Sequence, residues 1–240
     1  MEPVGDGIVT SRGRWSFGGD ICDVFETHIR RSVPLYDELH RLIASFAGSV
    51  VQNGGQVTDL GCSTGTLLRA VLSRHPTVHV VGVDIEPNMI AAALRLSSGR
   101  GTYLCEDIRS HSLGVNHLVT CCYTLQFVPP ADRLGVLKRV ARSLAPGGTL
   151  VLAEKVRRRD PALERLCVAA HHDFKRHQGF SDDQIAAKAR SLEGVLTPLF
   201  DDENLDLLRE AGFGFRELFL RHSCFDTWLA RPAWTSAVAG

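Results

Sequence analysis

The sequence lacks an excess of charge of either sign. Its 240 residues include 27 lysines and arginines and 27 aspartates and glutamates. Bulk positive charge drives non-specific binding to nucleic acids, and no segment combines basic and aromatic residues into a platform for stacking bases. Direct nucleic-acid binding is therefore disfavoured as the main task of this protein.

Long apolar runs are missing too. No run approaches the roughly 18 residues that cross a membrane, and the first residues, MEPVGDGIVTSRGR, have no apolar stretch of the kind that a signal peptide carries. We therefore expect a cytoplasmic protein without a membrane segment.

Cysteine pairs with metal-binding spacing are also absent. The seven cysteines include no C-x-x-C, which argues against a zinc site or a disulfide framework. The adjacent His171, His172 and Asp173 do not indicate a metal site either, because neighbours on a helix point about 100° apart. We expect reduced thiols, mostly in the core, and no metal.

What the sequence does contain is an alternation of apolar, strand-like runs with helical segments. The runs are QVTDL (56–60), VHVVGVD (78–84), TYLCED (102–107), HLVTCCY (117–123) and GTLVLAE (148–154). A helical pattern over 131–144 precedes the turn APGG. Strands of this kind, linked by right-handed helical crossovers, predict an open, mostly parallel α/β sheet.

The alternation changes after Glu154. Residues 157–197 form a mostly helical insertion, and the chain resumes with the helix ENLDLLREAG and the runs FGFRELFLRH and SCFDTWLA. These last two runs predict an antiparallel hairpin at one edge, which with the five earlier runs gives a seven-stranded sheet. We expect a flexible N-terminus over 1–14 and a single domain over 15–240, with the insertion as a lid or dimer contact.

The stretch VTDLGCSTGTLL (57–68) predicts a strand, a glycine loop and a helix. Such a loop brings backbone N–H groups and a helix N-terminus against a ligand. The second glycine of a dinucleotide loop, G-x-G-x-x-G, is replaced here by Ser63, and the lysine of a triphosphate loop is absent. The loop therefore favours a nucleotide-like ligand without a phosphate chain.

Two acidic residues refine that ligand. Asp84 ends the second strand, nineteen residues after Gly65, where a carboxylate accepts the hydroxyls of an adenosine ribose. Asp59 precedes the loop, too early for a ribose but well placed to accept from an ammonium or a loop amide. Adenosine with an amino-acid end is the ligand that fits both.

This pattern resembles the class I S-adenosylmethionine-dependent methyltransferases. Their first motif corresponds to Asp59, Gly61, Ser63 and Gly65, their ribose-binding acid to Asp84, their adenine-flanking acid to Asp107, and their L-x-P-G-G turn to residues 144–148. The resemblance implies a Rossmann-like class I methyltransferase fold, with S-adenosyl-L-methionine as the cofactor.

From Trp15 to about Leu229 the chain resembles, more closely, the bacterial carboxy-S-adenosylmethionine synthases, which place carbon dioxide from prephenate onto the cofactor's methyl carbon. The matching stretches include WSFGGDICDVF, RSVPLY, EDIRS, YTLQF, LAEK and HHDFKRHQGFSD. The family's cofactor contacts carry over to Tyr36, Gly61, Cys62, Ser63, Asp84, Ile85, Asp107 and Ile108. A homodimer is likewise implied, with a heteromeric partner as the alternative assembly.

Two positions depart from that family. Cys122 stands where the family has an asparagine beside the cofactor, and Ala189 stands where it has the arginine that pairs with the added carboxylate. A buried carboxylate left unpaired costs several kcal/mol, so this loss argues against the family's product. Arg190 would replace the arginine only if its helix were rotated or the alignment slipped by one residue.

Several residues are candidates for the substrate side. Either His172 with Arg176 or His171 with Lys175 would line a pocket above the cofactor, the alternative being a solvated helix face. Tyr123 and Gln126 follow the fourth strand, where an acceptor-side role competes with a core or capping role. The run 157–159 of three arginines is expected to be a solvated charge run rather than a substrate contact.

Three functions remain open. The first is methylation of a small molecule by an S-adenosylmethionine-dependent transferase, with His172 or Tyr123 as the base. The second is carboxy-S-adenosylmethionine synthesis, with Arg190 in place of the missing arginine, so that the cofactor site holds the carboxylated derivative. The third is a non-methylating cyclase or lyase on a repurposed fold.

Overall fold

The computed structural model describes residues 1–18, 21–51 and 54–233. Its main sheet has seven strands in the order β5-β4-β3-β6-β7-β9-β8. Along the chain these are β3 (Gln56–Leu60), β4 (His79–Asp84), β5 (Thr102–Cys105), β6 (Asn116–Cys122), β7 (Leu144–Lys155), β8 (Phe213–His222) and β9 (Phe225–Pro232).

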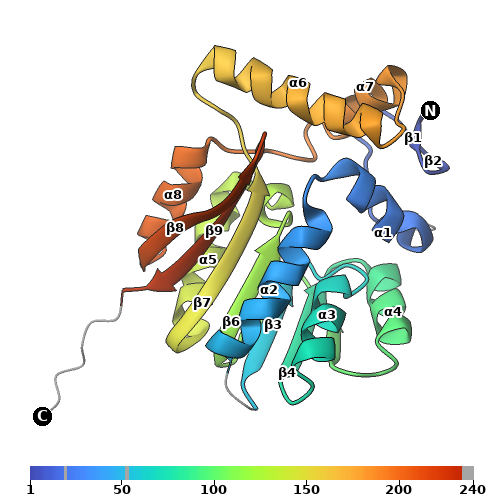
Figure 1. The fold of residues 1–240 in the computed structure, drawn as a ribbon. Coiled ribbons are helices and arrows are strands. Elements are labelled where there is room, and N and C mark those ends of the chain that lie inside the picture. Colours follow the sequence, from blue (N-terminus) through green and yellow to red (C-terminus); the bar gives the residue numbers. More distant parts are fainter. Residues whose placement is uncertain (19–20, 52–53, 234–240) are drawn as a thin grey trace, which may run out of the picture.

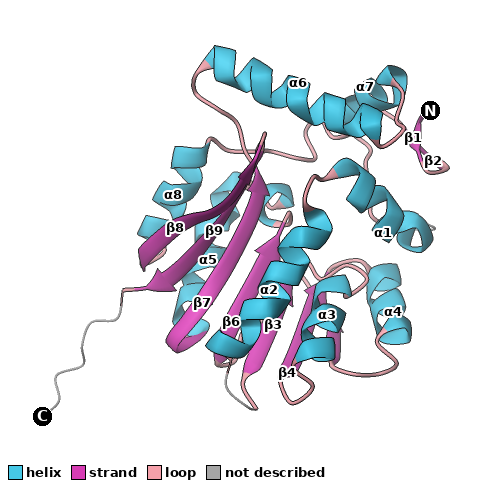
Figure 2. Ribbon diagram, in the orientation of Figure 1, coloured by secondary structure: helices cyan, strands magenta, loops and turns pink. Residues whose placement is uncertain are grey.

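The strand pairing confirms the expected sheet. The first five of these strands are parallel to their neighbours, and the β8–β9 hairpin adds to β7 in the antiparallel sense. Figures 1 and 2 show the hairpin closing one edge of the sheet. Parallel strands end at the same edge of a sheet, so the loops after β3, β4, β5 and β6 converge.

Helices cover both faces of the sheet. One face carries α2 (Tyr36–Val50), α3 (Thr66–Arg74) and α4 (Pro87–Leu96), and the other carries α5 (Pro130–Ser143) and α8 (Asp201–Glu210). Each helix turns an apolar stripe toward the strands; in α3 it is Leu67, Leu68, Val71 and Leu72. The helix that we expected over 131–144 is α5, which begins and ends one residue earlier, so that Leu144 is the first residue of β7.

The insertion lies across the carboxyl ends of the strands. Helices α6 (Pro161–His177) and α7 (Asp182–Ser191) extend over this edge, together with α1 (Ile21–Ser32) from the N-terminal part of the chain (Figure 1). These helices cover the space above the loops, and a role of the insertion as a lid or as a dimer contact stays a prediction.

The N-terminus differs from the flexible segment expected over 1–14. Strands β1 (Glu2–Gly5) and β2 (Ile8–Thr10) form a small antiparallel hairpin. Its Val4 and Ile8 are buried in one cluster with Trp15 and with Ala187 of α7. These two apolar side chains alternate with exposed ones, and burial against α7 holds the segment in place.

No helix among the described residues is both long enough and apolar enough to cross a bilayer.

Candidate active site

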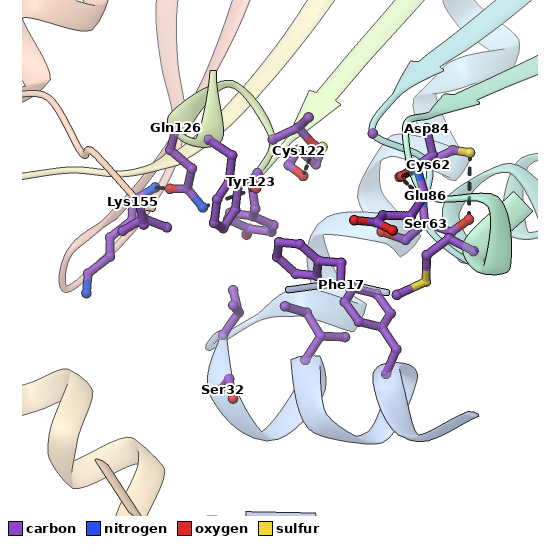
Figure 3. A pocket seen from close by; sticks show the side chains of 18 of the residues that line it. Phe17, Ser32, Cys62, Ser63, Asp84, Glu86, Cys122, Tyr123, Gln126 and Lys155 are labelled. Carbon is purple, nitrogen blue, oxygen red and sulfur yellow. Dashed lines mark hydrogen bonds between the residues drawn. The ribbon is translucent and has the colours of Figure 1, made fainter. Parts of the chain in front are cut away.

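A cavity of about 430 Å³ opens above the carboxyl ends of β3, β4, β5 and β6. Its walls come from the loops after these strands and from α1, α2, α6, α7 and the segment before α1. Figure 3 shows Asp84, Cys62 and Ser63 at one end and Lys155 at the other, with Phe17 and Tyr123 between them. The cavity is large enough for a nucleoside and a small second ligand.

The loop after β3 is tied to β4 by its backbone. The N–H groups of Gly61 and Cys62 both donate to the carbonyl of Val83, at 2.7 and 3.0 Å. Gly61 has φ of 82°, and a Cβ there would collide with the Thr124 side chain. Only glycine fits this position, which lets the loop pack against Thr124 while Gly61 itself lines the cavity.

Of the other loop residues, Cys62 and Ser63 line the cavity, whereas Gly65 does not. Gly65 starts α3 with φ of 76°, and a Cβ there would meet the Tyr103 ring. Gly65 therefore turns the chain into α3. The contact with the cofactor that we expected for it is not supported by the cavity lining.

Asp84 is nine-tenths buried at the end of β4. Its Oδ2 accepts the N–H of Ser63 at 2.9 Å, and its Oδ1 accepts the N–H of Glu86 at 3.0 Å. Burial raises the pKa of this carboxyl group. Each carboxylate oxygen keeps a free lone pair, which is what acceptance of two ribose hydroxyls requires.

Asp107 and Ile108 line the cavity just after β5, and Ile85 lines it after β4. The side-chain bond from Arg109 holds the pKa of Asp107 below its usual range, with Nε of Arg109 2.9 Å from Oδ2 of Asp107. Apolar Ile85 and Ile108 beside an acceptor such as Asp107 are suited to an adenine ring.

Asp59 lies beneath the loop and is buried. Its Oδ1 accepts the Thr120 hydroxyl at 2.6 Å, and burial raises the pKa of its carboxyl group to about 7. Tyr36 and Cys122 line the cavity nearby, and burial raises the pKa of both side chains. A cation placed here would favour the ionised form of Asp59.

The far end of the cavity is lined by Lys155 of β7, Lys175 of α6 and Lys188 of α7. Lys175 and Lys188 are about nine-tenths buried. Among the ion pairs between described residues, none involves these three lysines. Buried cations without a carboxylate partner are costly, so this end is suited to receive an anion.

The ionisation of these groups is coupled. Burial, followed by the charge of Lys155, lowers the pKa of Lys175 to about 8. Burial and the charge of Lys175 lower the pKa of Lys188. Burial and the same two lysines, 155 and 175, lower the pKa of His171 to about 2. A bound anion would relieve all of these repulsions at once.

His171 and Lys175 are therefore the pair that faces the cavity. They lie on one face of α6 with Cys167, four residues apart, and Nε2 of His171 is 2.9 Å from the carbonyl of Ser32. His172 does not line the cavity, and the guanidinium of Arg176 points to Asp182, with Nε 2.8 Å from Oδ1.

Tyr123 and Gln126 both line the cavity. Tyr123 has φ of 59°, and its ring lies 6.3 Å from that of Tyr36. The Gln126 side chain donates to the carbonyl of Tyr123 at 3.1 Å and accepts the N–H of Lys155 at 2.9 Å. Its polar atoms are thus used on the backbone, and Gln126 fixes the loop after β6.

Arg190 lies outside the cavity. It pairs with Glu2 at 3.1 Å, and its side chain is 42% exposed. Ala189 is exposed, whereas the side chain of Lys188, one position earlier, lines the cavity. Of residues 188–190, only Lys188 brings a cation to the wall of the cavity.

The run of arginines also differs from expectation. Arg158 is buried and forms a bidentate ion pair with the fully buried Asp226, both distances being 2.8 Å. Arg157 and Arg159 are both exposed, as expected of a solvated charge run, and Arg159 pairs with Asp202. The expectation failed at Arg158 because the chain that follows brings an acidic strand residue, Asp226 of β9, against it.

Sequence reasoning missed Trp15, Phe17, Phe25 and His28, which also line the cavity. They precede the first motif and carry no spacing that marks a site. Trp15, Phe17 and Phe25 belong to the stretch WSFGGDICDVF that matches the family, whereas His28 lies outside it and carries no signal in the sequence.

Comparison with known proteins agrees with this geometry. A family model described as "Methyltransferase domain" matches residues 57–148. A carboxy-S-adenosyl-L-methionine synthase of Actinobacillus succinogenes is 36% identical over 89% of this chain and 91% of its own length. One of Marinobacter nauticus is 37% identical over 88% and 86%, respectively.

Solved structures share the fold. An S-adenosylmethionine-dependent methyltransferase of Clostridium acetobutylicum is 14% identical, with a TM-score of 0.63, over 89% of this chain and 98% of its own. An O-methyltransferase family protein of Burkholderia thailandensis is 18% identical, also with a TM-score of 0.63, and the match covers 88% of this chain and 59% of that protein.

The fold and the motif-bearing loops define the class: this is an S-adenosylmethionine-dependent enzyme of the class I methyltransferase superfamily. Within that superfamily, the chain belongs to the carboxy-S-adenosyl-L-methionine synthase family.

Proposed function

We propose that this protein carboxylates the methyl group of S-adenosylmethionine, with a small anionic molecule as carboxyl donor. The observation that carries the proposal is a set of three lysines that line the cavity and lack carboxylate partners among the described ion pairs: Lys155, Lys175 and Lys188. Lys155 lies at the end opposite Asp84 (Figure 3). A methyl acceptor without charge would leave these cations uncompensated.

The other end of the cavity fits the cofactor. Asp84 has free lone pairs for the ribose, Asp107 and Ile108 flank the adenine position, and the loop residues Gly61, Cys62 and Ser63 line the cavity where the amino-acid part would lie. When bound, S-adenosylmethionine supplies an electrophilic, weakly acidic methyl carbon beside a sulfonium charge. Tyr36, Asp59 and Cys122 lie where they would surround that sulfonium group.

With prephenate as donor, the reaction balances without an added reagent. The ring carboxylate leaves as carbon dioxide, the ring hydroxyl leaves as hydroxide, and phenylpyruvate remains. The methyl carbon gives one proton to the hydroxide, forming water, and forms a carbon–carbon bond to the carbon dioxide. The protein's part is to place donor and methyl group together and to exclude bulk water.

Lys188 supplies the cation that the new carboxylate requires. The family arginine corresponds to Ala189, which is exposed here, whereas Lys188 is buried in the cavity wall. A lysine provides a mobile point charge in place of a bidentate fork. We therefore expect the carboxylated product to be held by Lys188 and not by Arg190.

Methylation of a small anionic acceptor is the second candidate, with the three lysines holding the acceptor. Cys122 and Ala189 favour it, because there the chain lacks the polar side chains of its family. In this case Tyr123 lies near enough to the cofactor end to orient the acceptor, whereas His172 lies outside the cavity lining.

Product analysis separates the two candidates. The protein is incubated with S-adenosylmethionine and prephenate, and phenylpyruvate and carboxylated S-adenosylmethionine are measured by mass spectrometry. Both compounds in equal amounts support carboxylation. S-adenosylhomocysteine together with a methylated acceptor from a metabolite extract would support methylation instead.

Two variants test which cation acts. Lys188→Met is expected to abolish most of the carboxylation, and Ala189→Arg to leave it unchanged. A large gain from Ala189→Arg, alone or with Cys122→Asn, would show that the missing family side chains are decisive and that Lys188 does not compensate for them.

We also infer a homodimer, as in the family resemblance. Support comes from the N-terminal half of α6, where the apolar side chains of Leu163 and Leu166 are 46% and 67% exposed. Light scattering of the wild type and of Leu166→Glu tests this: a dimer that the substitution dissociates is expected, and a wild-type monomer would contradict it.

A further inference from the structure

The N-terminal hairpin brings an acidic side chain to the wall of the cavity. Asp6 lies in the β1–β2 turn with φ of 54°, and its Oδ2 is 2.8 Å from Nδ1 of His28 on α1. The carboxylate is also paired with the guanidinium of Arg31. The side chains of Asp6 and His28 are only 8% and 4% exposed, so this contact is buried.

The contact fixes the tautomer of His28. A carboxylate accepts hydrogen bonds only, so Nδ1 of His28 carries the proton and donates to Asp6. Burial, followed by the charge of Lys188, lowers the pKa of His28 to about 4, so the ring is neutral at pH 7. Nε2 is then left with a lone pair and acts as an acceptor.

The acceptor Nε2 of His28 has no hydrogen-bond partner, and the donor Nε1 of the neighbouring Trp15 has none either. Nε2 of His28 and Nε1 of Trp15 are both buried without a hydrogen bond to any described residue. Both rings line the cavity, and they stack with centroids 5.6 Å apart and planes 22° apart. Buried polar groups without partners are rare and costly, so the two nitrogens indicate a ligand.

The charges around these rings come from four elements. Asp6 of the hairpin acts on His28 and pairs with Arg31 of α1. Lys188 of α7 lies over the Trp15 ring, and Lys175 of α6 acts on both Lys188 and His28. An ammonium group would be repelled here. A carboxylate would suit the lysines, but it has no proton to donate to Nε2 of His28.

We propose that Trp15 and His28 form a hydroxyl-binding subsite for the anionic substrate. The hydroxyl donates to Nε2 of His28 and accepts from Nε1 of Trp15, while the substrate carboxylate pairs with Lys175 and Lys188. A hydroxyl group is the simple functional group that donates and accepts at one atom and carries no charge. Asp6 is a positioning residue that orients His28.

The subsite explains why Lys188 lies where it does. Its ammonium group lies over the face of Trp15, a favourable position for a cation. A substrate carboxylate would draw this flexible side chain away and open the path to the two nitrogens. This inference depends on the proposed function only for the anionic character of the substrate.

The test measures binding and needs no turnover. The protein, saturated with S-adenosylhomocysteine, is titrated by calorimetry with cis-4-hydroxycyclohexanecarboxylate and with cyclohexanecarboxylate, which differ in one hydroxyl group. We expect the wild type to bind the hydroxylated compound roughly 5- to 20-fold more tightly, the effect of one or two buried hydrogen bonds. Equal binding of the two compounds by the wild type would overturn the subsite.

Variants then assign the preference to the two rings. His28→Phe keeps the stacked ring but removes the acceptor, and Trp15→Phe removes the donor; each is expected to reduce the preference to less than about twofold while S-adenosylhomocysteine still binds. His79→Phe, on the exposed end of β4 far from the cavity, is the matched control and keeps the preference. A preference that survives both cavity variants would refute the assignment.

The outcome also separates the subsite from the proposed reaction. A wild type that shows the hydroxyl preference but makes no carboxylated cofactor supports the subsite and contradicts carboxylation. A wild type that carboxylates but shows no preference contradicts the subsite alone. Asp6→Asn keeps an acceptor for His28 without the charge; because the Asp6 charge raises the pKa of His28, its loss lowers that pKa further, and the hydroxyl preference is expected to stay independent of pH between about 5 and 8.

Discussion

Replacing Lys175 by methionine is expected to stabilise the ligand-free protein. Burial, reinforced by the charge of Lys155, lowers the Lys175 pKa from 10.5 to about 8. At about 1.4 kcal/mol per pKa unit, this difference means that the folded state disfavours the ammonium by about 3 kcal/mol. Methionine keeps an unbranched chain of similar volume without the charge, so Lys175→Met regains most of that free energy at pH 7.

The sign of the pH dependence follows from proton binding. Between about pH 8 and 10.5 the unfolded chain holds the Lys175 proton and the folded protein does not, so wild-type stability rises with pH across this window. Below pH 8 both states are protonated, and the full cost is present. The advantage of Lys175→Met is therefore greatest at pH 7 and declines toward zero as the pH approaches 10.5.

Urea unfolding of both proteins at pH 7, 8, 9 and 10 measures the difference directly. Lys138→Met, on the exposed side of α5, is the control and is expected to change the free energy of unfolding by less than about 0.5 kcal/mol at every pH. A Lys175→Met protein that is less stable than the wild type at pH 7, or an advantage that is constant with pH, would refute the reasoning.

The same substitution is expected to weaken substrate binding, since it removes one of the three cations that the anion meets. We expect affinity for prephenate to fall about tenfold or more in Lys175→Met, measured by calorimetry in the presence of S-adenosylhomocysteine. A variant that is more stable and binds the anion less well is the outcome typical of a residue kept for function.

Three further outcomes are expected. Asp84→Asn removes the charged acceptor for the ribose, and S-adenosylhomocysteine affinity falls roughly 10- to 100-fold in calorimetry. Lys188→Met lowers the carboxylation rate by roughly 10- to 100-fold. Its S-adenosylhomocysteine affinity stays within about twofold of the wild type, whereas an unfolded variant would not bind this ligand. Asp226→Asn leaves Arg158 buried without its full countercharge, and urea unfolding shows a loss of about 3 kcal/mol with cofactor affinity retained.

The cofactor end of the site was predictable from the sequence because its geometry is local. A strand, a tight turn at Gly61 and a helix fix the loop within a few residues, and parallel strands then bring the ends of β4 and β5 to the same edge. Asp84 and Asp107 therefore appear at the cavity as expected. The order of strands follows from the same short-range rules.

The substrate end was not predictable in the same way, since it depends on which face of α6 is buried. His171 with Lys175 and His172 with Arg176 have the same spacing, and the large apolar residues Leu163 and Leu166 of this helix are exposed. No apolar stripe therefore marks the inner side. Tertiary contacts with β9 determine which face of α6 is buried: the ring of Phe225 packs against that of His171, with their centroids 5.0 Å apart.

His28 and Lys188 are harder still to recognise in the sequence. They lie 160 positions apart in the sequence. They come together only because the N-terminal hairpin packs against α7 through Val4, Trp15 and Ala187. The sequence of the hairpin looked like a flexible terminus because its two strands are short. Its burial depends on a partner helix that is distant in the chain.

Identification of the product tests the central claim most directly. Purified protein with S-adenosylmethionine and prephenate is expected to yield carboxylated S-adenosylmethionine and phenylpyruvate in equal amounts by mass spectrometry, with Lys188→Met strongly reduced. Unchanged S-adenosylmethionine in the presence of prephenate, or S-adenosylhomocysteine formed together with a methylated product, would contradict the account.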